Sequence, residues 1–216
     1  MRYLVVGNSP DCNSASVAAV AAPGLPVVAL DGAARKIPVS ISPSIVCGDF
    51  DSISPGEAAL LHAGAEIVQL QDQNENDFEK ALRLLAARGA REVLACGVLG
   101  GRPDQNLANL GVIVRHHGTL SICALHCGME CRVASPGVEL RLSLRAGDEV
   151  SVVPFGSSAT ISLAGVRWPL ERELLNGGSH GVSNVAIGGE VLVIPQSGNV
   201  FVFSKQRLVS GCASEG

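Results

Sequence analysis

Short apolar runs alternate with helix-like segments along the first 118 residues of the chain. Helix starts are marked by Ser54-Pro55-Gly56-Glu57 and by Asn76-Asp77-Phe78-Glu79, in which a polar side chain precedes the first helical turn. The expected strands are residues 2–6, 26–30, 44–47, 66–70 and 91–95, and the expected helices are 14–22, 55–63, 77–88 and 103–117. Strands that alternate with helices in this way predict an α/β unit: a mostly parallel sheet with helices on both faces.

The pattern changes after Gly118, where short apolar runs are separated by turn residues. These runs are residues 137–144, 148–154, 159–163, 191–194 and 200–203, and Gln196-Ser197-Gly198-Asn199 predicts a hairpin turn between the last two. A strand about every ten residues indicates a small all-β sandwich or barrel. We therefore expect two domains, an α/β domain at residues 1–130 and a smaller β-sandwich at residues 131–216.

Composition narrows the class of protein. Of the 216 residues, 47% are apolar and 17% charged, which is ample for a core and excludes intrinsic disorder. A net charge of −4 argues against a general nucleic-acid binder. No apolar run approaches the roughly 18 residues of a membrane helix. The N-terminal run ends at Gly7, too short for a signal-peptide core, so we expect a cytoplasmic protein whose seven cysteines are free thiols.

Six aspartates lie just past the expected strands or at helix starts. They are Asp31, Asp49, Asp51, Asp72, Asp77 and Asp104. Ligands of open α/β sheets bind at the carboxyl ends of the strands, so we expect these side chains to converge on one crevice. Aspartate is also common in turns and at helix N-termini, so each of them taken alone fits a purely structural role.

The most specific candidate for a functional site among these aspartates is the segment Gly48-Asp49-Phe50-Asp51-Ser52. Two carboxylates two residues apart in an extended segment point to the same side, and like charges held so close repel unless a cation or a proton lies between them. Hard oxygen ligands favour magnesium. Asp77 begins a helix and can face the same crevice, whereas Glu79 and Lys80 of that helix are expected to be solvated or to cap it.

The segment Gly100-Gly101-Arg102-Pro103-Asp104 suits an anion. Its glycines allow close backbone approach, the following helix presents N–H groups, and Arg102 can form a forked contact with phosphate oxygens. The structural alternative is an ordinary strand-to-helix turn. Neither a Walker A loop nor a G-x-G-x-x-G motif occurs. The cysteines at 123, 127 and 131 do not have the usual zinc spacing, so we expect buried thiols there.

The order of these motifs resembles that of the thiamine pyrophosphokinase family. The matching segments are Asp31-Gly32-Ala33-Ala34, Gly48 to Ser52, Asp72-Gln73, Asn76 to Leu82, Gly100 to Gln105 with Asn109, Gly165 to Leu170 and Ser179 to Asn184. The chain departs from the family pattern at Ala33, where glycine is usual, at Asn76, where threonine is usual, and at Gln105, where histidine is usual. Gln105 keeps the capacity to form hydrogen bonds but cannot titrate near neutrality.

The resemblance implies a two-domain homodimer that transfers the pyrophosphoryl group of ATP to the hydroxyethyl oxygen of thiamine. ATP and magnesium would bind the α/β domain, and thiamine the β domain at the interface with the other subunit. The implied magnesium ligands and catalytic residues are Asp49, Asp51, Asp77 and Asp104, with Arg102 offsetting phosphate charge. The implied nucleotide contacts are Asn8, Asp31, Asp72, Gln73, Gly101 and Asn109, and the implied thiamine contacts are Trp168, Ser183 and Asn184.

Two other functions fit the same residues. A pyrophosphokinase could act on a different acceptor, such as a hydroxymethylpterin, without any change to the α/β motifs. Trp168 favours thiamine, because an aromatic face attracts the positive thiazolium ring. A non-catalytic protein could retain thiamine or nucleotide, but a pure binder has little need to hold several like charges together.

Overall fold

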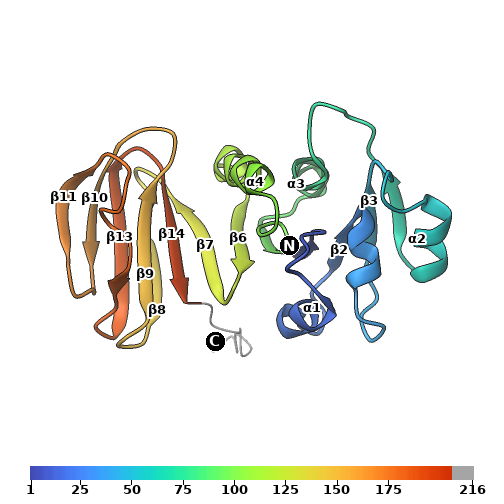
Figure 1. Ribbon diagram of the computed structural model, residues 1–216, viewed down its shortest axis with the longest axis horizontal. Coiled ribbons are helices and arrows are strands. Elements are labelled where there is room, and N and C mark those ends of the chain that lie inside the picture. The colour runs from blue at the N-terminus through green and yellow to red at the C-terminus, as the bar shows by residue number, and fades with distance from the viewer. Residues whose placement is uncertain (206–216) are drawn as a thin grey trace. The chain divides into compact units, whose positions relative to one another are not determined.

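The computed structural model describes residues 1–205 and divides them into two compact units (Figure 1). The first unit is Met1–His126, and the second begins at Cys127. Cys212 and the end of the expected second domain lie outside the described residues.

The first unit is built on six parallel strands in the order β6-β5-β1-β2-β3-β4. The chain order reverses between β1 and β5, which places a topological switch point at the carboxyl ends of these strands. The strands are β1 (Arg2–Val6), β2 (Val27–Leu30), β3 (Ile45–Gly48), β4 (Glu66–Gln69), β5 (Glu92–Cys96) and β6 (Ser121–His126).

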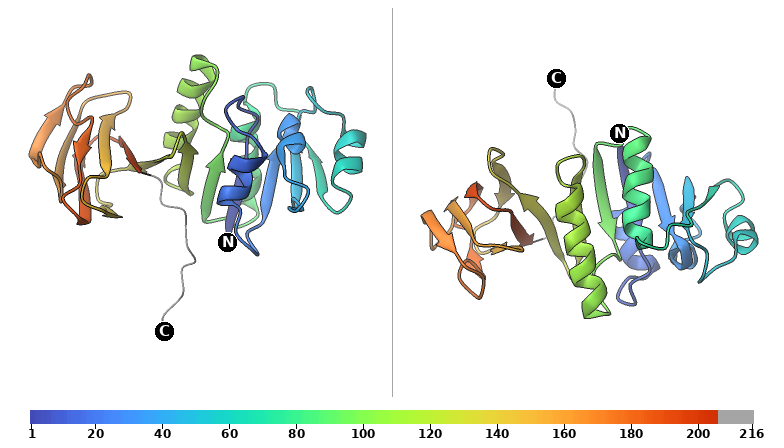
Figure 2. Two further views of the ribbon diagram at one scale, coloured as in Figure 1. Left: turned by 60° about the horizontal axis from the view of Figure 1, so that its bottom comes forward. Right: turned by 90° about the horizontal axis from the view of Figure 1, so that it is seen from above.

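Helices cover both faces of this sheet (Figures 1 and 2). They are α1 (Ser14–Val20), α2 (Pro55–Leu61), α3 (Asp77–Ala87) and α4 (Pro103–His116), and a 3₁₀-helix η1 (Asp31–Lys36) follows β2 directly. Alternate strand residues such as Leu4 and Val6 pack with Val17 of α1 and Ala58 of α2 in one buried cluster. Figure 1 shows α3 and α4 on the opposite face, so the sheet is buried on both sides, as a parallel sheet requires.

Three helices begin where an N-cap side chain accepts a backbone N–H. Asn13 accepts from Ser16 at 2.9 Å, Ser54 accepts from Glu57 at 3.1 Å, and Asn76 accepts from Glu79 at 3.0 Å. The helix starts predicted at residues 54–57 and 76–79 are thereby confirmed.

The second unit contains two antiparallel sheets, β12-β9-β14-β7 and β11-β10-β13-β8. Valines 152 and 202 of the first sheet and Ile161 and Val193 of the second belong to one buried core, which makes the unit a β-sandwich. Its strands are β7 (Met129–Ala134), β8 (Leu140–Leu144), β9 (Glu149–Pro154), β10 (Ala159–Ala164), β11 (Leu170–Leu175), β12 (Asn184–Val185), β13 (Gly189–Ser197) and β14 (Val200–Lys205).

The predicted fold class is confirmed: a mostly parallel α/β sheet is followed by an all-β sandwich. The hairpin predicted at residues 196–199 is wrong, because β13 pairs with β8 and β10 whereas β14 pairs with β7 and β9. The turn residues determine that the chain reverses, but they do not determine which strands pair. Strands β13 and β14 enter opposite layers of the sandwich because each buries its apolar face in the core between the layers. Strand β11 was not expected, because four of its six residues are exposed and form no apolar run.

Two further observations bear on the expectations about thiols and membranes. Cys12 and Cys96 are buried and reduced, with their Sγ atoms 3.6 Å apart, and the hydrogen bond from Cys96 lowers the pKa of the Cys12 thiol to about 7. Within residues 1–205, no helix has the length and apolar character needed to cross a membrane.

Candidate active site

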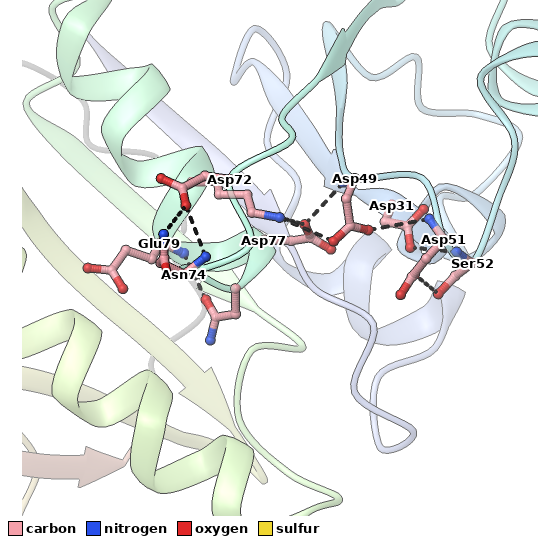
Figure 3. Close-up of polar contacts among 10 residues, drawn as sticks. Asp31, Asp49, Asp51, Ser52, Asp72, Asn74, Asp77 and Glu79 are labelled. Carbon is pink, nitrogen blue, oxygen red and sulfur yellow. Dashed lines mark hydrogen bonds and ion pairs between the residues drawn. The ribbon is translucent and has the colours of Figure 1, made fainter.

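Three aspartates gather at the carboxyl ends of the neighbouring strands β2 and β3 (Figure 3). Asp31 follows β2, and Asp49 and Asp51 follow β3. One carboxylate oxygen of each lies within 4.8 Å of the others. Across residues 1–205, this is the one group of three or more His, Cys, Asp or Glu side chains that converges closely enough to share an ion.

Backbone N–H groups hold Asp31 in this cluster. Its Oδ2 accepts from the Ser52 N–H at 3.0 Å and its Oδ1 from the Ile53 N–H at 3.2 Å, which ties the end of β2 to the loop after β3. Burial raises the pKa of Asp31. Asp51 is exposed, and the hydroxyl of Ser52 donates to its Oδ1 at 2.8 Å, which lowers the pKa of Asp51. The cluster therefore contains carboxylates in two different environments.

Lys80 connects this cluster to the first turn of α3. Its Nζ lies 3.2 Å from Asp49 Oδ2 and 3.3 Å from Asp77 Oδ1, and its side chain is only 3% exposed. The Asp49 backbone N–H also donates to Asp77 Oδ1 at 3.3 Å. Asp77 is therefore joined to the three clustered aspartates through Asp49 and a shared buried cation.

The expectation that Glu79 and Lys80 are solvated is wrong. Both are buried, and each has an ionic partner: Lys80 has the two aspartates, and Glu79 accepts from Arg115 of α4 at 2.7 Å. Lys80 follows Asp77 by three residues, so the helix places both on one face. Pairing removes most of the cost of burying their charges. The spacing from Asp77 to Lys80 was the signal in the sequence that could have revealed this pair.

Gly48 lets the carboxylates approach one another. Its φ of +155° lies outside the range that side chains favour. A Cβ atom there would come within 2.9 Å of the Asp31 Cβ and 3.3 Å of the Asp77 Cγ. The glycine in the segment from 48 to 52 is thus needed for packing of the site as well as for its backbone conformation.

Replacing Asp77 by asparagine should stabilise the metal-free protein. Burial, with the nearby Asp49 charge, raises the pKa of Asp77. An acid with a raised pKa in the folded state costs stability as the pH rises through that value. The amide in Asp77→Asn keeps an oxygen to accept from the Asp49 N–H, so we expect a gain of about 1 kcal/mol, or about 2–4 °C in Tm, at pH 7. The gain should disappear below about pH 4, where Asp77 is protonated in both states. Thermal melts at both pH values measure this, and a lower Tm at pH 7 would contradict it.

The second predicted cluster, at the start of α4, is built differently. Arg102 donates to both carboxylate oxygens of Asp104, at 3.1 and 2.5 Å, and both side chains are exposed. This hydrogen bonding lowers the pKa of Asp104. The Gly101 N–H donates to Asp11 Oδ2 at 2.9 Å. The structure thus does not bring Asp104 into the group formed by Asp31, Asp49 and Asp51.

The other residues expected at the nucleotide lie in three places. Asn8 follows β1, and its Nδ2 is 2.6 Å from where a Cβ of Gly32 would be, so it borders the end of β2. Asp72 accepts from the Asn74 N–H at 2.9 Å and lies apart from the aspartate cluster (Figure 3), and Gln73 is exposed beside it. Asn109 is buried on α4, where its amide bonds to other protein groups. A pocket of about 470 Å³ between the end of β4 and α3 includes Asp72 and Lys80 in its wall.

In the second unit, Trp168 is exposed over 56% of its surface, which rules out a core role for its ring. The buried Asn184 holds its backbone by accepting from the Trp168 N–H at 3.1 Å and donating to the Trp168 carbonyl at 2.6 Å. The Arg167 guanidinium lies 5.5 Å from the ring centroid. Ser183 is held with a φ of +58°, and its N–H donates to Ser151 Oγ at 2.9 Å. The unit therefore presents an aromatic face from a rigid backbone.

These features define a class of protein. A doubly wound α/β unit with carboxylates gathered at the carboxyl ends of its strands is typical of proteins that bind phosphorylated ligands through a metal ion. Two protein-family models match the chain: "Thiamin pyrophosphokinase, catalytic domain" over residues 25–124, and "Thiamin pyrophosphokinase, vitamin B1 binding domain" over residues 138–198.

Relatives and solved structures agree with these matches. Thiamine pyrophosphokinase 1 of Oryza sativa subsp. japonica is 26% identical over 182 residues, or 78% of this chain and 69% of the relative. Thiamine pyrophosphokinase 1 of Arabidopsis thaliana is 25% identical over 177 residues, or 76% of this chain and 66% of the relative. The crystal structure of thiamine pyrophosphokinase from Bacillus subtilis has a TM-score of 0.81 at 19% identity and covers 96% of this chain and 100% of its own, which is a likeness of fold. The chain belongs to the thiamin pyrophosphokinase family.

Proposed function

We propose that this chain transfers the pyrophosphoryl group of ATP to the hydroxyethyl oxygen of thiamine. The thiamine oxygen attacks the β-phosphorus, the bond from that phosphorus to the α–β bridging oxygen breaks, and AMP and thiamine diphosphate form with release of the hydroxyl proton. The observation that carries the proposal is the convergence of Asp31, Asp49 and Asp51 within 4.8 Å, in a chain that matches the catalytic and vitamin B1 binding models in order.

The donor set at the site suits magnesium. Its members are carboxylate oxygens, the hard ligands that this ion prefers, and their like charges repel unless a cation offsets them. Asp49 and Asp51 would hold the ion, with Asp31 and Asp77 beside them. When bound there, magnesium would offset the charge of the phosphates and help to orient them.

Of Asp77 and Asp104, Asp77 has the pKa better suited to accepting the proton of the thiamine hydroxyl. Burial and the Asp49 charge raise the pKa of Asp77, whereas pairing with Arg102 lowers that of Asp104. A base accepts a proton more readily as its pKa approaches the working pH. Lys80 keeps Asp49 and Asp77 in place before substrate binds, and its charge lowers the pKa of Asp77 against the effects of burial and Asp49.

The remaining roles follow from position. Arg102, just before the 14-residue α4, is exposed, so its guanidinium can offset charge on the phosphates, while Asp104 holds that guanidinium by two hydrogen bonds. The other residues of the nucleotide site are Asn8, Asp31, Asp72, Gln73 and Asn109. Each of them either borders the nucleotide or holds a residue that does. Trp168, with Ser183 and Asn184, receives thiamine. The proposal includes a homodimer, as the resemblance implies, and a cytoplasmic location, which the reduced buried thiols favour.

Removing the ring of Trp168 should weaken thiamine binding with little effect on stability. The exposed ring offers a face to the thiazolium cation, and cation–π contacts contribute about 1–2 kcal/mol when desolvated. Trp168→Ala should therefore raise the KM for thiamine about tenfold, while Trp168→Phe keeps most of the affinity. Steady-state kinetics with varied thiamine test this at saturating ATP. An unchanged thiamine KM in Trp168→Ala would remove Trp168 from the site.

The proposed function is tested by AMP formation from ATP and magnesium, with and without thiamine. We expect thiamine-dependent AMP and an equal amount of thiamine diphosphate. Thermal stabilisation by thiamine without AMP would indicate a non-catalytic binder. Neither stabilisation nor AMP with thiamine, but AMP with a hydroxymethylpterin, would indicate the same fold acting on another acceptor.

A further inference from the structure

Two asparagine side chains connect the start of α3 to α4 and to the segment after β5. Asn76, the N-cap of α3, donates from its Nδ2 to Asn109 Oδ1 at 2.8 Å. Asn109, on α4, is only 7% exposed and donates from its Nδ2 to the Val98 carbonyl at 2.5 Å. With the bond from the Glu79 N–H to Asn76 Oδ1 at 3.0 Å, a continuous set of three hydrogen bonds links the three segments.

The chemistry of the partners fixes the orientation of both amides. The Val98 carbonyl can only accept, so Asn109 must turn its nitrogen to it and its oxygen toward Asn76. The Glu79 N–H can only donate, so Asn76 must turn its oxygen to it and its nitrogen toward Asn109. A carboxylate at position 76 would cap the helix but would lack the N–H donor, and a serine hydroxyl would be too short to reach Asn109. The link therefore requires an amide at residue 76.

We infer that Asn76 and Asn109 are positioning residues for Asp77. Asp77 directly follows Asn76, and its Oδ1 must accept both from the Asp49 N–H and from Lys80 Nζ, each at 3.3 Å. These contacts are long, so a small movement of the first turn of α3 would break them. Linking that turn to the buried Asn109 prevents the movement.

Helix α4 also holds the segment Gly100–Gly101 in place. The Gly100 N–H donates to Asn106 Oδ1 of α4 at 2.7 Å, one helical turn before Asn109. The two asparagines of α4 thus fix the spacing between the Gly100–Gly101 segment and the aspartates around Asp77. This inference rests on the proposed function, since that spacing matters only if phosphates and a metal ion bind across it.

A matched pair of substitutions tests the inference. Asn76→Ser keeps a capping oxygen and loses the link to Asn109. Asn13→Ser makes the same change at the N-cap of α1, where Asn13 accepts from the Ser16 N–H and Ser16 Oγ of its own helix. Two readouts apply to nucleotide-free protein: Mn²⁺ affinity by electron paramagnetic resonance, and hydrogen exchange of the Asp49 backbone amide.

We expect Asn76→Ser to weaken Mn²⁺ binding about tenfold, which is the usual effect of removing a group that orients a metal ligand. It should also speed exchange of the Asp49 amide, whereas Asn13→Ser should change neither. Equal Tm losses in both variants, with unchanged Mn²⁺ affinity and exchange, would show that Asn76 is only a helix cap and overturn the inference.

The outcomes also separate the inference from the proposed function. If the unsubstituted protein binds no Mn²⁺ and forms no AMP, the proposed function fails. Hydrogen exchange of the Asp49 amide then still tests whether Asn76 positions Asp77. Faster exchange in Asn76→Ser than in Asn13→Ser supports the inference, and equal exchange overturns it. Should Asn76→Ser fail to fold, Asn76→Asp takes its place, because it keeps the capping oxygen and the side-chain shape while removing the donor.

Discussion

Asp49→Asn is expected to lower turnover about a thousandfold while the protein stays folded. Asp49 is the residue through which the parts of the site meet. Its backbone N–H donates to Asp77, its Oδ1 accepts from the Asp51 N–H at 3.3 Å, and its Oδ2 pairs with Lys80. The amide keeps the size of the side chain and one accepting oxygen, but it removes a negative charge from the proposed magnesium site. Initial rates of AMP formation at saturating magnesium, ATP and thiamine measure the loss.

Glu66→Gln is the matched control for this substitution. Glu66 lies at the start of the edge strand β4 and pairs with Arg88, and its side chain is half exposed. The same change from carboxylate to amide there should leave turnover within about twofold, because an exposed ion pair contributes little. If Asp49→Asn retains more than a tenth of the activity of Glu66→Gln, the assignment of Asp49 to the metal fails.

The sequence allows the framework of this site to be predicted because its parts are local or follow from topology. Ser54 and Asn76 mark helix starts by hydrogen bonds to a residue only three positions further along the chain. Asp31 and Asp49 could be expected to meet because each directly follows a strand, and parallel neighbours end at one edge of the sheet. Alternating strands and helices were enough to predict that topology.

What could not be predicted depends on contacts between distant segments. Lysine is usually a surface residue. Lys80 is removed from water and gains two anionic partners only because β3 and α3 approach each other in the fold. The link from Asn76 to Asn109 joins residues 33 positions apart, and neither motif alone indicates it. The turn at residues 196–199 shows the same limit, since a turn motif does not say which sheet the next strand joins.

Lys80→Met is expected to destabilise the metal-free protein by about 2–3 kcal/mol and to make magnesium more stabilising than it is for the unsubstituted protein. Removing one partner of a buried pair costs about 3–5 kcal/mol. Here the cost is reduced because Asp49 and Asp77 are 27% and 24% exposed and can recover part of their hydration. Without the ammonium, the two carboxylates repel each other, and a divalent cation is the remaining group that can offset them. Tm with and without magnesium measures both effects.

The pH dependence of this destabilisation gives a further check. Lys80 lowers the pKa of Asp77 against the opposing effects of burial and Asp49, so its loss should raise that pKa further. A protonated carboxyl needs no cation, and the destabilisation should therefore shrink as the pH falls through the raised pKa of Asp77. Arg83→Met, which removes an exposed cation paired with Asp72 and Glu75, should cost less than about 1 kcal/mol and show no added response to magnesium. If magnesium stabilises Lys80→Met no more than Arg83→Met, Lys80 does not share Asp49 and Asp77 with the metal site, and the position of Asp77 beside the magnesium ion must be abandoned.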